Sequence, residues 1–211
     1  GTFQKWTSVG STFRHCHFDD LRVEDLSPGS GHVPSHFVDC TFDRSVLRAP
    51  ALGKAHFIRC SFRDVRLQRW NTVGDFVDCV FTGRGERCAF HGAERSFDTN
   101  EVIRRADFRG NDFSGMTFRD VSFRDDINLR LQRLPNGEDD LYIRDAALRI
   151  GQARRRLLAF DDQAVRDELT LILNVIHREV DLHHQTDVFI RASDLATDAQ
   201  MRQQLIVMLG A

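Results

Sequence analysis

The sequence is poor in lysine, tyrosine and tryptophan, and it has no long apolar run. Of its 211 residues, two are Lys, one is Tyr and two are Trp, whereas 17 are Phe. Arginine therefore carries nearly all of the positive charge. No apolar stretch approaches the roughly 20 residues that a membrane-spanning helix needs, so no membrane segment is expected. What stands out instead is the phenylalanine, whose spacing is regular.

The charge balance and the cysteine count also narrow the possible functions. The formal net charge is −2 and the isoelectric point is about 6.5, which gives no general attraction to nucleic acid or to anionic membranes. We therefore do not expect direct binding of nucleic acid. The N-terminus lacks a signal-peptide pattern, and the number of cysteines is odd. Both observations favour a reducing compartment, and we expect the cytoplasm.

A six-residue pattern with Phe at both ends recurs along the first half of the chain. Segments 37–42, 57–62 and 76–81 follow one another after 20 and then 19 residues. A fourth copy, 13–18, begins 24 residues before the first of these. The extra length there is explained by residues 27–34, whose Ser, Pro and Gly content predicts an inserted loop.

Large apolar residues recur every fifth position within and beyond these copies. They are Phe37, Phe42, Leu47, Leu52, Phe57, Phe62 and Leu67, and later Phe108, Phe113, Phe118 and Phe123. A spacing of five suits neither a helix nor a flat strand, but it suits a short strand followed by a corner. Two places before the large residue the chain has small residues, which point the same way along a strand. Two places after it come mostly Asp and Gly, which form turns.

Four such units make a coil of about 20 residues, which matches the longer period. Ala106–Gly110, Asn111–Gly115 and Met116–Asp120 carry the five-residue motif most clearly. In these segments the chain resembles the pentapeptide-repeat family, whose members form a right-handed quadrilateral β-helix. The resemblance covers about residues 1–128 and implies a mainly β solenoid. An all-β sandwich is the competing interpretation.

The repeat is irregular in three places. These are the loop at 27–34, a one-residue deletion near residues 70–74, and a blurred stretch at 83–103. Within the last, Cys88–Phe90 and the region around Phe97 resemble the motif. We therefore expect the coils to continue through it.

Stacked coils would place equivalent residues above one another. An interior column is expected for Cys16, Cys40, Cys60 and Cys79, as core packing and not as a metal site, because no close Cys-x-x-Cys pair exists. The position after the large residue points outward, yet in three coils it is apolar: Val38, Ile58 and Val77. This candidate interaction ridge would be covered by the chain's own tail or loop, or by a partner.

After Asn128 the spacing of five ends, and residues 129–211 are predicted to form a helical domain. Helices are expected from about Asn136 to Phe160, from Asp161 or Asp162 to His184, and from Ser193 or Thr197 onward, with Thr197 and Gln200 as a capping box. The last helix would cap the rod or join two copies as a homodimer, or both. Its candidate residues are Leu205, Ile206, Met208 and Leu209.

The sequence contains no recognisable catalytic constellation. His177, His183 and His184, near Glu179 and Asp181, lack the spacing of three or four that a helical metal pair favours, and a solvated helix end is the better interpretation. The run Arg154–Arg156 has nearby acids and is interpreted as a solvated face. We expect no enzyme activity, no cofactor and no metal site, although a metal-dependent activity of the tail stays open as a third hypothesis.

Two functional hypotheses remain ahead of that one. The first is a non-catalytic scaffold that binds a protein partner, since repeat rods present long, regular surfaces. The second is implied by the family resemblance, because some members mimic DNA and modulate bacterial type II topoisomerases. Mimicry needs an acidic surface, whereas the outward positions here mix both signs, as at Asp43, Arg48 and Arg63.

Overall fold

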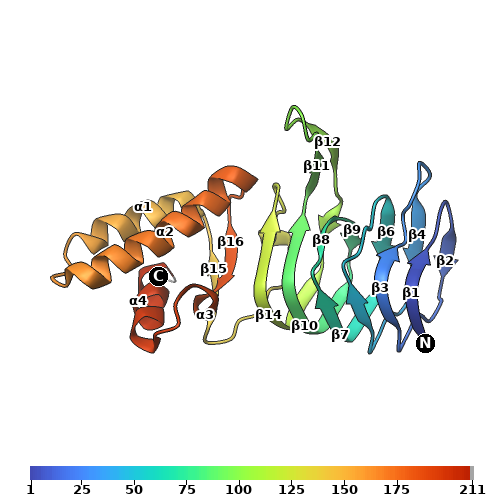
Figure 1. Cartoon of the computed structure of the whole chain (residues 1–211), viewed down its shortest axis with the longest axis horizontal. Coiled ribbons are helices and arrows are strands. Elements are labelled where there is room, and N and C mark those ends of the chain that lie inside the picture. The colour runs from blue at the N-terminus through green and yellow to red at the C-terminus, as the bar shows by residue number, and fades with distance from the viewer. Residues whose placement is uncertain (210–211) are drawn as a thin grey trace. The chain divides into compact units, whose positions relative to one another are not determined.

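The computed structural model describes residues 1–209, which form two compact units (Figure 1). The first unit comprises Gly1–Phe123 and Ile127–Pro135. The second comprises Arg124–Asp126 and the chain from Asn136 onward. No helix among the described residues combines the length and the apolar character needed to cross a membrane.

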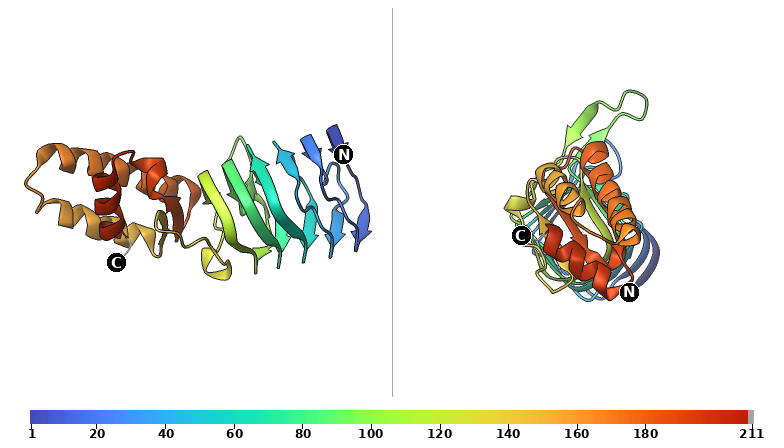
Figure 2. Two further views of the ribbon diagram at one scale, coloured as in Figure 1. Left: turned by 90° about the horizontal axis from the view of Figure 1, so that it is seen from below. Right: turned by 90° about the vertical axis from the view of Figure 1, so that its left-hand side faces the viewer.

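The first unit is a parallel β-solenoid, which confirms the predicted fold class. One seven-stranded sheet has its strands side by side along the solenoid (Figure 2): β1 (Thr2–Thr7), β3 (Arg22–Ser27), β5 (Val46–Arg48), β7 (Ser61–Gln68), β10 (Val80–His91) and β14 (Asp112–Arg124), with β8 (Asn71–Val73) paired to β10. A five-stranded sheet contains β2 (Thr12–Arg14), β4 (Ser35–Val38), β6 (Ala55–Ile58), β9 (Asp75–Val77) and β13 (Phe108–Arg109).

The interior is filled by two ladders of stacked phenylalanine rings. In the first, consecutive rings lie 4.9–5.0 Å apart: Phe13, Phe37, Phe57 and Phe76. In the second they lie 4.6–5.1 Å apart: Phe18, Phe42, Phe62, Phe81 and Phe113. The spacing equals the distance between hydrogen-bonded strands, so each coil contributes one ring to each ladder. The five-residue periodicity of the sequence is the trace of this packing.

Corners of the solenoid use the left-handed backbone conformation. At one corner Asp39, Arg59, Asp78 and Gly110 follow paired strands and have φ values of 54°, 51°, 55° and 67°. The sequence predicts turns there from Asp and Gly, but arginines also occupy the corners. Left-handed φ disfavours arginine, and a partner in the previous coil offsets the cost. The Arg59 guanidinium donates to both carboxylate oxygens of Asp39 at 2.8 Å.

One segment leaves the solenoid as a hairpin. Strands β11 (Ala93–Arg95) and β12 (Val102–Arg105) pair antiparallel and project from the neighbouring strands (Figures 1 and 2). The Ala106 N–H donates to the Gly92 carbonyl at 2.8 Å, so the chain returns to the place it left. Phe90 is buried in a coil, but the expectation that the region around Phe97 continues the coils is wrong.

The second unit is mainly helical. Its elements are β15 (Asp140–Ile143), α1 (Ala146–Leu157), α2 (Gln163–His183), β16 (Val188–Arg191), α3 (Ala192–Leu195) and α4 (Ala199–Leu209), and a short 3-10 helix (Leu129–Leu131) belongs to the first unit. Leu169, Ile172, Ile176 and Val180 form the buried stripe of α2, as predicted. Asp162 caps this helix by accepting from the Ala164 N–H at 2.9 Å.

Two expectations for this unit need correction. The predicted helix from Asn136 is a strand at its start, because residues 140–143 pair antiparallel with residues 188–191, a contact that local periodicity does not reveal. The cap of α4 is also different. The Asp198 carboxylate accepts from the Met201 N–H at 2.9 Å, so Asp198 takes the role assigned to Thr197.

Candidate functional site

The apolar ridge predicted from the sequence is in register but largely covered. Val38, Ile58 and Val77 are cross-strand neighbours in the five-stranded sheet. Val38 and Val77 are only 7% and 8% exposed, and Ile58 is half-buried. The ridge runs between the stacked rings of two histidines, which precede it on the strands, and the Asp39–Arg59 corner pair, which follows it. It offers a partner little apolar area.

The four cysteines occupy equivalent places in successive coils. Cys40, Cys60 and Cys79 are at most 1% exposed, and Cys16 in the first coil is half-buried. Burial raises the pKa of the Cys79 thiol well above its usual value, and it raises the pKa of Cys88 to about 11. These two thiols therefore stay protonated at neutral pH and are poor nucleophiles.

The residues proposed for a dimer helix lie mostly in the core of the helical unit. Leu205, Met208 and Leu209 are at most 5% exposed, and Ile206 is partly buried against the same core. They are committed to folding of their own unit because they complete the packing of α1 and α2. Exposed apolar side chains occur instead along one stripe of α2: Leu171, Val175 and Leu182, which are 66%, 52% and 56% exposed.

The most exposed aromatic side chain of the described residues lies at the tip of the projecting hairpin. Phe97 is 102% exposed, and Ile103 on the second strand is 65% exposed. The tip is nevertheless ordered by its own hydrogen bonds. The Ser96 N–H donates to the Glu101 carbonyl at 2.8 Å, and the Asn100 N–H donates to the Ser96 carbonyl at 3.0 Å. The loop thus holds Phe97 in water at a fixed position.

The base of this hairpin is fixed to the solenoid by a buried ion pair. Both oxygens of Asp75, whose side chain is 4% exposed, accept from Nη1 of Arg104 at 2.9–3.0 Å. Nη2 of Arg104 also donates to the Gly53 carbonyl at 3.0 Å. His56 Nδ1 lies 3.1 Å from Asp75, and burial lowers the pKa of His56 although Asp75 opposes this shift. The hairpin is therefore held at both its base and its tip.

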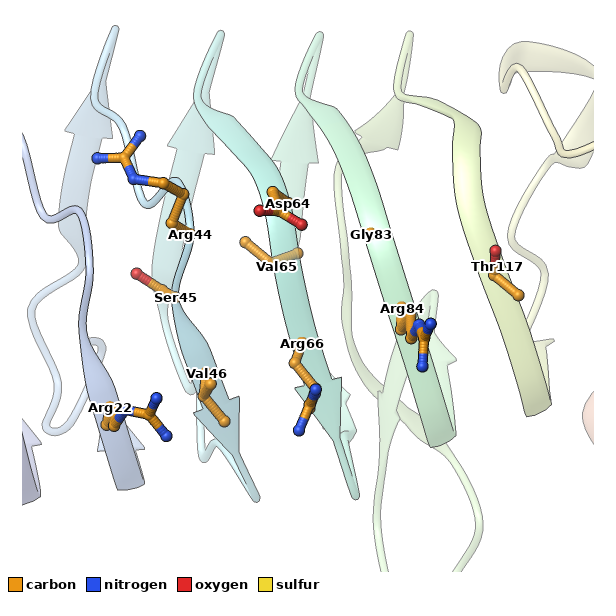
Figure 3. Close-up of a pocket in the computed structure, with 10 residues that line it drawn as sticks. All are labelled: Arg22, Arg44, Ser45, Val46, Asp64, Val65, Arg66, Gly83, Arg84 and Thr117. Carbon is orange, nitrogen blue, oxygen red and sulfur yellow. The ribbon is translucent and has the colours of Figure 1, made fainter.

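A groove of about 440 Å³ lies on the outer surface of the seven-stranded sheet. Its centre is a cross-strand column formed by Arg22, Val46, Arg66 and Arg84, one residue from each of four neighbouring strands (Figure 3). The remaining lining residues are Arg44, Ser45, Asp64, Val65, Gly83 and Thr117. Side chains of the three arginines in the column are exposed and come from β3, β7 and β10.

The neighbouring column of the same sheet differs sharply from this one. There the residue types alternate and bond to one another: Arg48 donates to Glu24 at 2.9 Å and to Gln68 at 2.7 Å, and Gln68 donates to Glu86 at 3.2 Å. Within residues 1–209, by contrast, the guanidinium groups of Arg22, Arg66 and Arg84 show neither an ion pair nor a side-chain hydrogen bond. Two columns of one sheet thus contrast as paired and unpaired charge.

The remaining polar clusters are accounted for by local pairing. His177 lies 3.1 Å from Asp181 one helical turn on, and His183 lies 3.8 Å from Glu179. Arg154 donates to the side chain of Asn174 at 2.9 Å. No group of three or more metal-ligating side chains in the described part of the chain is placed to hold a metal ion.

Comparison with known proteins adds no assignment. A scan against models of protein families finds no match to this chain, and a search of curated proteins finds no relative of significant similarity. The functional argument therefore rests on the surface of the molecule itself.

Sequence reasoning missed both the hairpin tip and the arginine column. A signal for the hairpin was available, because Arg95 stands two places before Phe97, where a coil needs a small residue. The column was also visible as Arg22, Arg66 and Arg84, which precede the inward-facing position at near-constant intervals. Their lack of partners was not, since pairing between coils depends on side-chain geometry.

Proposed function

We propose that this chain is a non-catalytic scaffold that binds a protein partner, and that the hairpin β11–β12 is its main contact. The observation that carries the proposal is the fully exposed Phe97 at the tip of an ordered, anchored hairpin. Large aromatic side chains are frequent anchors at protein interfaces, where they fill a pocket of the partner.

The order of the hairpin supports this role. A flexible tip would lose conformational entropy on binding, whereas a tip fixed by its own hydrogen bonds has already lost it. Asp98 and Glu101 flank Phe97 and would be repelled by an anionic lipid surface, so an apolar pocket in a protein is the better match. Burial of the phenylalanine ring contributes about 1.5–3 kcal/mol, roughly 10- to 100-fold in affinity.

Affinity capture from native lysate tests the proposal with three forms of the full chain. These are the natural sequence, Phe97→Ser, and the control Leu131→Ser, which removes an apolar side chain that is 51% exposed elsewhere in the same unit. We expect a partner protein that is retained by the natural sequence and the control and reduced at least tenfold by Phe97→Ser. No retained protein, or equal retention by Phe97→Ser, would contradict the proposal.

Membership of the pentapeptide-repeat family is part of this proposal, supported by the five-residue motif and by the stacked phenylalanine ladders. The alternative function, DNA mimicry toward a bacterial type II topoisomerase, gains no support from the seven-stranded sheet, whose groove is lined by arginine. A supercoiling assay with purified gyrase tests it. Inhibition or protection at micromolar protein would favour mimicry over the scaffold.

Homodimerisation through the helical unit remains a prediction, now centred on the exposed α2 stripe. Light scattering of the purified chain measures the mass directly. A dimer that becomes a monomer on Leu171→Glu, with Leu148→Glu as the control on α1, is the expected outcome, because a buried charge without a partner opposes association. A monomeric natural chain would contradict it.

A further inference from the structure

The arginine column is an arrangement that costs the solenoid stability when nothing is bound to it. Arg66 and Arg84 are direct cross-strand neighbours, and strands in a sheet lie about 4.8 Å apart. Arg22 is separated from Arg66 by the coil that contributes Val46. Like charges at such distances repel each other, and no carboxylate in the described residues neutralises these three. An anionic ligand in the groove would relieve the repulsion.

Arginine also determines which anions fit. Its planar guanidinium binds carboxylate or phosphate through two parallel hydrogen bonds, and it loses little conformational freedom for each bond formed. A row of three arginines along the solenoid matches a ligand with several anionic groups in line. A single small anion could engage two neighbouring coils at most.

The other lining residues separate an acidic protein segment from a nucleic acid. Single-stranded nucleic acids are held by aromatic side chains on which the bases stack, yet the lining residues include no aromatic side chain. Duplex DNA needs many phosphate contacts from a strongly basic surface, whereas this chain has a net charge of −2. Val46, half-buried at the middle of the column, instead offers an apolar contact between two charged ends.

We propose that the groove lined by Arg22, Arg66 and Arg84 binds a short acidic segment of a protein, with carboxylates of that segment paired to the three guanidinium groups. The inference goes beyond the scaffold function by naming the chemistry of a partner. It uses a surface separate from the hairpin tip. A groove without this affinity would leave the role of Phe97 untouched.

Fluorescence anisotropy with a labelled peptide of ten glutamates tests the inference in low salt. We expect saturable binding by the natural chain and at least tenfold weaker binding by the triple variant Arg22→Gln/Arg66→Gln/Arg84→Gln. The matched control is Arg14→Gln/Arg63→Gln/Arg119→Gln, which removes the same charge from three exposed arginines outside the groove. Control binding should stay within twofold of the natural chain, and Phe97→Ser should bind the peptide normally.

Three results would overturn the inference. The first is equal loss of binding in the control, which would mean non-specific attraction by net charge. The second is a labelled ten-nucleotide thymidine strand that binds more tightly than the peptide and depends on the same three arginines. The third is full displacement of the peptide by millimolar inorganic phosphate, which would show a site for a small anion. Circular dichroism of each variant verifies that the solenoid is folded.

Discussion

At the scale of single residues, the same amino acid serves opposite purposes in this chain. Phe57 is 2% exposed and stacks between two other rings, whereas Phe97 is fully exposed. We expect Phe57→Ala to lower the free energy of unfolding by about 3–5 kcal/mol, because it leaves a cavity within the ladder. Phe97→Ala should change it by less than about 0.5 kcal/mol. Denaturant titration of both variants measures the difference, and equal effects would contradict the assignment.

Arginines divide in the same way between structure and surface. Replacing Arg104 with Ala leaves the Asp75 carboxylate buried without its main partner, and we expect a loss of about 3 kcal/mol in unfolding free energy. Arg84→Ala, at an exposed arginine of the groove, should cost less than about 0.5 kcal/mol. Thermal unfolding followed by circular dichroism compares the two, and a stable Arg104→Ala chain would show that the hairpin base does not depend on this pair.

At the scale of secondary-structure elements, the corners should make stability depend on pH. Hydrogen bonds from Arg44 and Arg59 lower the pKa of Asp20 and of Asp39 below the usual value. A carboxyl whose pKa is lowered by folding stabilises the fold above its unfolded pKa of about 3.9, and the contribution is lost as pH falls below that value.

The double variant Arg44→Gln/Arg59→Gln should therefore lose less stability than the natural chain between pH 5 and pH 2.5. Urea titrations at several pH values provide the measurement. The control Arg14→Gln/Arg63→Gln retains both corner pairs and should follow the natural chain. A double variant with unchanged pH dependence would show that these pairs contribute nothing to the linkage.

Elements that follow a local period were predictable, and those that depend on distant pairing were not. Inward Phe at every fifth position and the Asp162 cap are encoded within a few neighbouring residues, so the solenoid and α2 could be predicted. Strand β15 could not, because its partner β16 lies more than 40 residues later and each strand alone is short. The candidate site failed for the same reason, since the unpaired state of Arg66 depends on residues of other coils.

At the scale of the whole molecule, the two units have separate cores and should respond separately to mutation. Gly151 lies within α1 with nothing within 4 Å of an added Cβ, so Gly151→Ala should stabilise that helix by about 0.5–1 kcal/mol. We expect calorimetry to show this variant raising the transition of the helical unit, and Phe57→Ala lowering that of the solenoid. A single transition shifted by both would mean that the units unfold as one.

The hydrogen bond that closes the chain from Gly92 to Ala106 has one more consequence. Because the excursion starts and finishes at adjacent points, its length and sequence are free of the 20-residue rhythm that governs every other coil. Recognition can thus be rewritten at the tip without repacking the interior. The corner works as a socket into which foreign loops could be grafted.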